Sequence, residues 1–163
     1  MKSAGTLKKA KFSIPEKDEK GVFSIREKDA VEVAKEIKHL KVLVGEDMRL
    51  NQLLMKIILT DFGFEHDIVS NGKLIIEKLL ANSYDIILMD LHMPEMDGFE
   101  AAEYIRVTMN SKIPIIALTA DAIPADLEKF MASGMNDYIS KPVEDDLLYS
   151  KMVSLVENST FAK

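Results

Sequence analysis

From residue 41 onward, five short apolar runs alternate with five segments of helical periodicity, and this alternation constrains the fold more than any other feature. The apolar runs occupy 41–45, 65–70, 84–90, 113–120 and 136–142, and the helical segments occupy 48–63, 71–83, 98–110, 124–134 and 143–158. Largely apolar strands that alternate with helices form parallel sheets with helices on both faces. The sequence therefore predicts an α/β fold with one five-stranded parallel sheet.

Local residues mark where the helices start. The segment 48–63 carries apolar residues at helical spacing, namely Leu50, Leu53, Leu54, Ile57 and Ile58. Asn71 and Gly72 are expected to open the second helix, and Asp97 with Gly98 indicates a turn and the start of the third. An acid that follows a strand is often a helix cap, so Asp47 is a candidate cap for the first helix.

Charge divides the chain near residue 40. Residues 1–40 hold ten Lys/Arg and seven Asp/Glu, whereas residues 41–163 hold eleven and twenty. We interpret 1–40 as a linker or N-terminal extension, 41–158 as the domain and 159–163 as a C-terminal tail. Within the extension, 11–26 is a candidate hairpin, and 29–40 is either a flexible connector or a helix that packs on the domain or on a partner.

Composition excludes several classes of function. The acidic domain is a poor candidate for nucleic-acid binding, which depends on neutralising phosphates, and we expect none. The absence of cysteine excludes disulfides, thiolate metal sites and thiol nucleophiles. The sequence shows no apolar stretch of membrane-spanning length and no signal-peptide pattern, so we expect a cytoplasmic chain without a membrane segment.

Polar residues follow the predicted strands at one edge of the sheet. Glu46 and Asp47 follow the first strand, and Asp90, Thr119 and Lys141 stand at the ends of the third, fourth and fifth. Ligand sites in parallel α/β sheets lie beyond the carboxyl ends of the strands. We therefore expect three carboxylates, one hydroxyl and one ammonium to converge there.

This set of groups is typical of phosphoryl transfer. Clustered carboxylates repel one another unless a hard cation neutralises them, and oxygen ligands suit Mg²⁺. An aspartate can act as a nucleophile and form an aspartyl-phosphate. A lysine and a hydroxyl supply donors for phosphoryl oxygens. Each acid alone is as compatible with a structural role, and only the whole set indicates the chemistry.

At these residues the sequence closely resembles the receiver domain of response regulators in two-component signalling. The matching pieces are VLVGED, DIILMDLHMPEMDGFEA, PIIALTA and DYISKP, in order over about 41–158. The resemblance implies the flavodoxin-like receiver fold with strand order 2-1-3-4-5. The pieces EDMRLNQ, MPEMDGFEA and IIALTA are most similar to receivers of hybrid histidine kinases.

The resemblance also implies roles for individual residues. Asp90 is expected to be the phosphoacceptor, and Glu46, Asp47, Asp90 and the backbone carbonyl of His92 are expected to hold Mg²⁺. Glu46 departs from the family, in which an aspartate is common at this position. The side chain of His92 is a weaker candidate for a ligand or proton donor.

The remaining roles concern the phosphoryl group and the response to it. Thr119 is expected to hydrogen-bond the phosphoryl group, Lys141 to pair with it, and Tyr138 to be the aromatic switch residue that follows Thr119. A cis peptide is expected between Lys141 and Pro142. The implied partners are a histidine kinase or a histidine phosphotransfer protein. A second copy, through the face formed by the predicted helix 124–134, the last strand 136–142 and the last helix 143–158, is a further option.

Two other functions stay open at this point. One is a docking or dimerisation module that works without phosphorylation, and the other is a Mg²⁺-dependent phosphohydrolase that uses Asp90 with a general acid at His92. No Gly-rich ATP-binding pattern is visible, so kinase activity would lie outside this chain. We expect no conventional enzyme beyond catalysis of its own Mg²⁺-dependent phosphorylation and dephosphorylation.

Overall fold

The protein is represented by a computed structural model that describes residues 39–121 and 127–161. It contains one five-stranded sheet in the order β2-β1-β3-β4-β5, with every neighbouring pair parallel. The strands are β1 (Lys41–Gly45), β2 (Glu65–Val69), β3 (Ile86–Asp90), β4 (Ile115–Thr119) and β5 (Asp137–Ser140). This confirms the predicted fold class and strand order. The candidate hairpin at 11–26 and nearly all of the segment 29–40 lie outside the described residues.

The helices connect the strands as predicted, with small shifts at their ends. They are α2 (Arg49–Asp61), α3 (Gly72–Ala81), α4 (Gly98–Glu103), α5 (Leu127–Ala132) and α6 (Asp145–Phe161). A π-helical turn, η1 (Tyr104–Thr108), continues α4. The last helix runs to Phe161 and so includes the first three residues of the segment expected to be a tail.

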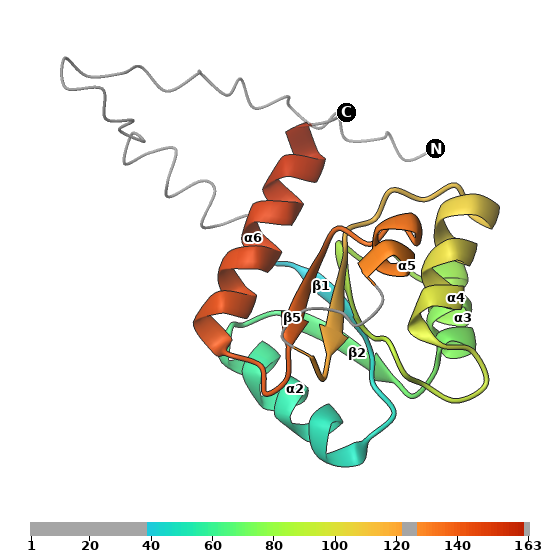
Figure 1. Cartoon of the computed structure of the whole chain (residues 1–163). Coiled ribbons are helices and arrows are strands. Elements are labelled where there is room, and N and C mark those ends of the chain that lie inside the picture. The colour runs from blue at the N-terminus through green and yellow to red at the C-terminus, as the bar shows by residue number, and fades with distance from the viewer. Residues whose placement is uncertain (1–38, 122–126, 162–163) are drawn as a thin grey trace. The chain divides into compact units, whose positions relative to one another are not determined.

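The helices form two layers on opposite faces of the sheet (Figure 1). On one face α3, α4 and α5 cover a cluster that includes Leu43, Ile87, Met89 and Ala117. On the other, α2 and α6 cover a cluster to which the strands contribute Val42, Val44, Ile86, Leu88, Ile116 and Leu118. Successive residues of a strand point to opposite faces, so each central strand supplies both cores. Met93 and Met96 pack with the first cluster, as expected of methionines that fill a core.

The helix starts agree with the sequence in two cases out of three. The side chain of Asn71 accepts a hydrogen bond from the N–H of Leu74, and Asp97 forms a capping box with Glu100 at the start of α4. The candidate cap at Asp47 is not present, because Met48 is the N-cap of α2 and no side-chain hydrogen bond caps the helix there. The N–H of Met48 donates to the Glu46 carboxylate at 3.0 Å.

The first helix turns most of its apolar residues to solvent. Leu50, Leu53, Leu54 and Ile57 are 49–66% exposed. The residues of α2 that are fully buried in the core are Met55 and Leu59. The helical spacing in the sequence therefore predicted the helix correctly, but it marked a solvent-facing apolar stripe, which we call the α2 stripe (Leu50, Leu53, Leu54 and Ile57).

A half-buried arginine in the middle of η1 ties this turn to the segment before β5. The guanidinium of Arg106 donates to the carbonyl oxygens of Gly134 (2.9 Å) and Ser111 (3.0 Å) and to Oδ1 of Asn136 (3.0 Å). The same oxygen of Asn136 accepts the N–H of Ile115 at 2.8 Å, at the start of β4. Burial lowers the pKa of Arg106 from its usual value. These bonds fix the amino ends of β4 and β5 opposite the candidate site.

Candidate functional site

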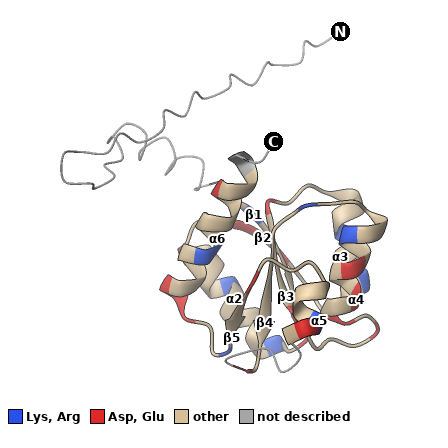
Figure 2. Cartoon of the chain, turned by 45° about the horizontal axis from the view of Figure 1, so that its top comes forward, with Lys and Arg blue, Asp and Glu red and all other residues tan. Residues whose placement is uncertain are grey.

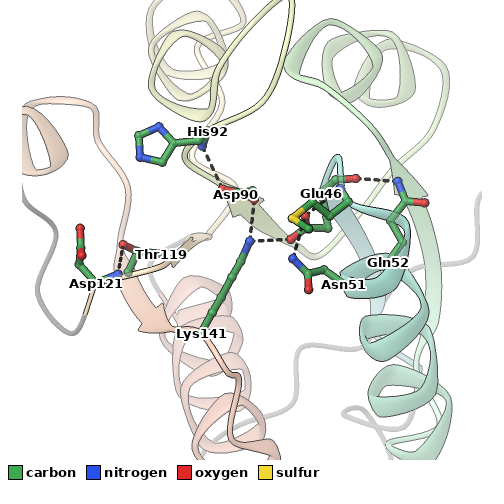
Figure 3. Close-up of polar contacts among 9 residues, drawn as sticks. Glu46, Asn51, Gln52, Asp90, His92, Thr119, Asp121 and Lys141 are labelled. Carbon is green, nitrogen blue, oxygen red and sulfur yellow. Dashed lines mark hydrogen bonds and ion pairs between the residues drawn. The ribbon is translucent and has the colours of Figure 1, made fainter.

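Glu46, Asp90 and Lys141 meet at the carboxyl edge of the sheet, and Figure 3 shows their side chains directed toward one another. Strand register brings the ends of the strands level, since Gly45 pairs with Met89 and Asp90 with Leu118. The central strands β3 and β4 carry charge only at Asp90, whereas the helices carry charges of both signs (Figure 2). Asp90 is therefore a single carboxylate at the end of a fully apolar strand.

Lys141 joins two carboxylates, Asp90 at the end of β3 and Glu46 directly after β1. Its Nζ lies 2.6 Å from Oδ2 of Asp90 and 2.7 Å from Oε2 of Glu46. The side chain of Glu46 is fully buried, and that of Asp90 is 9% exposed. Burial opposes the charge on Lys141, but the hydrogen bonds to Asp90 and Glu46 outweigh it and raise the pKa of the amine. The ammonium therefore stays protonated and holds the two acids together.

The second oxygen of Asp90 is also held. Oδ1 accepts the backbone N–H of His92 at 2.9 Å. The following loop folds tightly against the strand end, and Gly98 donates its N–H to the carbonyl of Leu91 at 3.1 Å. A Cβ at Gly98 would lie 2.3 Å from the carbonyl oxygen of Asp90, so only glycine fits there. Both carboxylate oxygens of Asp90 are thus positioned by separate donors.

Three acids at this edge form a set that fits a divalent cation. One oxygen each from Glu46, Asp47 and Asp90 lie within 4.8 Å of one another. The carboxylate of Asp47 is exposed, while the other two are buried. Carboxylate oxygens with space for water are the donors that Mg²⁺ prefers, so the donor set suits this ion. The assignment of the His92 carbonyl as a further ligand stays a prediction, and the side chain of His92 is exposed.

The two other predicted residues lie at the neighbouring strands. Thr119 is buried at the end of β4, and its hydroxyl accepts the N–H of Asp121 at 3.1 Å. Tyr138 is half-buried in β5, edge-on to Phe130 with ring centroids 5.6 Å apart. The ammonium of Lys151 lies 5.5 Å from the centre of the Tyr138 ring. The Lys141–Pro142 peptide is cis, as the resemblance implied.

Sequence reasoning missed two contacts of Glu46. The side-chain amide of Asn51 donates to Oε1 at 3.3 Å, and that of Gln52 donates to the backbone carbonyl at 2.6 Å. Both residues come from the first turn of α2. Asn51 stands out in the sequence as part of EDMRLNQ, but nothing in that string indicates which group the amide contacts.

Comparison with known proteins gives a family match over most of the chain. The profile described as "Response regulator receiver domain" matches residues 42–153. Hybrid signal transduction histidine kinase I of Dictyostelium discoideum is 44% identical over 117 residues, which cover 67% of this chain and 7% of that protein. Probable histidine kinase 1 of Oryza sativa is 36% identical over 135 residues, covering 63% of this chain and 14% of that protein. The chain thus spans a small part of the curated relatives it matches.

The solved structures that the chain resembles are also receiver domains. The receiver domain of a sensor histidine kinase from Pseudomonas aeruginosa, with a magnesium ion in its active-site cleft, aligns with a TM-score of 0.68 at 33% identity over 73% of this chain and 98% of that one. A Saccharomyces cerevisiae receiver domain, crystallised with a histidine phosphotransfer protein, aligns with a TM-score of 0.65 at 30% identity over 70% of this chain and 86% of that one. Among the described residues, no helix is long and apolar enough to cross a bilayer.

Proposed function

Since the chain belongs to the response regulator receiver domain family, we propose that it accepts a phosphoryl group on Asp90 from a phosphohistidine of a partner protein. The observation that carries this proposal is the position of Lys141, whose ammonium touches the buried carboxylates of Asp90 and Glu46 at once. A cation at that point is ready to pair with phosphoryl oxygens as they arrive on Asp90.

The residues of the site divide the reaction between them. An oxygen of Asp90 attacks phosphorus, the P–N bond to the donor histidine breaks, and the leaving nitrogen keeps the electron pair. Glu46, Asp47 and Asp90 would hold Mg²⁺, which supplies positive charge for the phosphoryl oxygens when bound. Lys141 then pairs with the transferred group, and we assign a hydrogen bond from the Thr119 hydroxyl to it. The same hydroxyl can go on accepting the N–H of Asp121, because it has one proton to donate and two lone pairs to accept.

We further propose that phosphorylation changes the face formed by α5, β5 and α6. Movement of Thr119 toward the phosphoryl group frees space beside Tyr138, whose ring contacts Phe130 of α5 and Lys151 of α6. Because the phosphoryl group interacts more favourably with one of the two arrangements of this face, phosphorylation shifts the population toward that arrangement. A downstream partner or a second copy of the chain would bind that face in its changed arrangement.

The phosphodonor needs a surface beside Asp90, and the α2 stripe supplies one. The helix begins four residues after the end of β1, at the same edge of the sheet as the site. It is largely uncharged in Figure 2, with Arg49, Lys56 and Asp61 as its charged residues. Exposed apolar patches mark interaction surfaces. We assign the stripe to a histidine phosphotransfer protein, the class of protein crystallised with the yeast receiver.

The wider context is part of the same proposal. The curated relatives named above are histidine kinases of much greater length. We propose that this receiver acts in a phosphorelay of that kind, with residues 1–40 as a linker, in the cytoplasm. The acidic charge of residues 41–163 disfavours direct binding to nucleic acid.

Intact mass measurement tests the acceptor. Protein incubated with acetyl phosphate and Mg²⁺ should gain about 80 Da, the mass of one phosphoryl group, and neither EDTA-treated protein nor Asp90→Asn should gain it. Asp85→Asn is the matched control, because Asp85 lies just before the opposite end of β3 and is exposed. Uptake that persists in Asp90→Asn would contradict the assignment, and no uptake by wild type would favour a docking module. Turnover of small phosphate esters would instead indicate a phosphohydrolase.

A second experiment tests the docking surface. Leu53→Ala with Ile57→Ala should lower kcat/KM for transfer from a phosphorylated histidine phosphotransfer protein at least about fivefold, and should leave uptake from acetyl phosphate unchanged. Val107→Ala is the control, since Val107 is 75% exposed on η1, away from the stripe. Equal losses with both phosphodonors would show that the variant damages the site rather than docking.

A further inference from the structure

The buried carboxylate of Glu46 is held on both oxygens by different elements. Oε2 contacts Lys141 at 2.7 Å, while Oε1 accepts the N–H of Met48 at 3.0 Å and the side-chain amide of Asn51 at 3.3 Å. We propose that Asn51 is a positioning residue that holds Oε1, so that Oε2 stays directed toward Lys141 and Asp90. This inference rests on the proposed function and adds a residue to it.

The length of the Glu46 side chain explains why such a holder is needed. Glutamate has one more rotatable bond than the aspartate common at this position in the family, so its carboxylate has more conformations to lose on ordering. A hydrogen bond to a charged group is worth more than one between neutral groups and recovers part of that cost. Asn51 supplies this bond from a helix whose axis is fixed by packing.

The placement of Asn51 on α2 separates this role from helix capping. Asn51, Met55 and Leu59 are spaced four residues apart and share the face of α2 that turns toward the sheet. Asn51 is the polar member of this row, at the end beside Glu46. It is the third helical residue, where a capping-box side chain would accept the N–H of the N-cap. That N–H goes to Glu46 instead, and Asn51 acts as a donor to the same oxygen.

The hydrogen bonds of the Glu46 main chain support the proposed role of Asn51. Gln52 donates to the carbonyl oxygen of Glu46 at 2.6 Å, and the N–H of Glu46 donates to the carbonyl of Val69 at 2.9 Å. The main chain of Glu46 is therefore anchored without Asn51. The side-chain torsions remain to be fixed, and the N–H of Met48 and the amide of Asn51 restrain them together at Oε1.

A double-mutant cycle tests the inference through metal affinity. Titration calorimetry with MgCl₂ on unphosphorylated protein gives Kd for wild type, Asn51→Ala, Glu46→Asp and the double variant. We expect Asn51→Ala to raise Kd about three- to tenfold, and to change it less than about twofold in the Glu46→Asp background, where the shorter arm withdraws from Asn51. Asn82→Ala, an exposed asparagine at the end of α3, is the control and should bind like wild type.

The outcomes separate this inference from the proposed function. A Kd for Asn51→Ala within about twofold of wild type, or an equal loss in both backgrounds, would overturn the positioning role. Thermal unfolding in EDTA shows whether a loss reflects damage to the fold. Phosphoryl uptake at saturating Mg²⁺ is measured separately and should persist in Asn51→Ala, so a failure of acceptor chemistry would appear there and not in the titration.

Discussion

Replacing Lys141 by methionine should destabilise the metal-free domain strongly. Methionine keeps most of the side-chain volume and removes the charge, so the change isolates the electrostatic role of the ammonium. In the wild type this ammonium touches Asp90 at 2.6 Å and Glu46 at 2.7 Å. In the variant the two buried carboxylates face each other without a cation.

The expected loss follows from the spacing of the acids. One oxygen of Glu46 and one of Asp90 lie within 4.8 Å. Two unit charges at that distance repel by about 3 kcal/mol at an effective dielectric constant of about 20. Removal of one partner from a buried ion pair costs a similar amount, about 3–5 kcal/mol. A loss near 3 kcal/mol would lower the Tm of a domain of this size by roughly 10 °C.

Thermal unfolding in EDTA and in Mg²⁺ is the assay. Lys151→Met is the matched control, because Lys151 is similarly exposed (26% against 22% for Lys141) and also has a close carboxylate, Asp137 at 2.7 Å. Asp137 is itself 31% exposed, so this pair should contribute no more than about 1 kcal/mol. At the proposed site Mg²⁺ would neutralise the same carboxylates as Lys141, so it should raise the Tm of Lys141→Met more than that of wild type.

Two results would refute this reasoning. A Tm of Lys141→Met in EDTA within about 2 °C of wild type would show that the carboxylates do not need the ammonium. Equal stabilisation of both proteins by Mg²⁺ would show that the ion and Lys141 do not act on the same acids.

Three smaller changes give further checks. Gly98→Ala should cost about 3 kcal/mol in urea unfolding, because its Cβ would meet the Asp90 carbonyl oxygen at 2.3 Å. Tyr84→Phe removes a 2.5 Å hydrogen bond to Asp67 that lowers the pKa of that carboxyl. The bond therefore stabilises the fold above pH about 4, and this contribution is lost as the pH falls through the lowered pKa. Urea unfolding should show a deficit of about 1 kcal/mol at pH 7 that shrinks at pH 3. Asn71→Ala removes the cap of α3 and should lower stability by about 1 kcal/mol in the same assay.

The fold could be predicted from the sequence because its periodicities are local. Every strand and helix predicted from residue 41 onward is present, and strand ends place Glu46, Asp90 and Lys141 together because parallel strands end at one edge. The π-helical turn η1 was not predicted. It is a local change of hydrogen bonding that apolar periodicity does not report.

The details that could not be predicted depend on side-chain direction in three dimensions. The α2 stripe has the spacing of a core face, yet Met55 and Leu59 occupy the core, because the direction of a helix face is set by its packing partners. The candidate cap at Asp47 failed for a related reason. Helix α2 begins one residue later than the pattern indicated, with Met48 as its N-cap, and this start depends on how the chain passes from β1 into α2.

The two faces of α2 have a consequence for the evolution of signalling pathways. Substitutions at Leu53 or Ile57 would change the surface that we propose for a partner, without touching the packing of Met55 and Leu59 or the contact of Asn51 with Glu46. Duplicated copies of such a domain could therefore diverge in which phosphodonor protein they recognise, while the residues around Asp90 stay the same. A few substitutions on the exposed face of α2 would then reduce crosstalk between parallel pathways, without any change at the proposed acceptor Asp90.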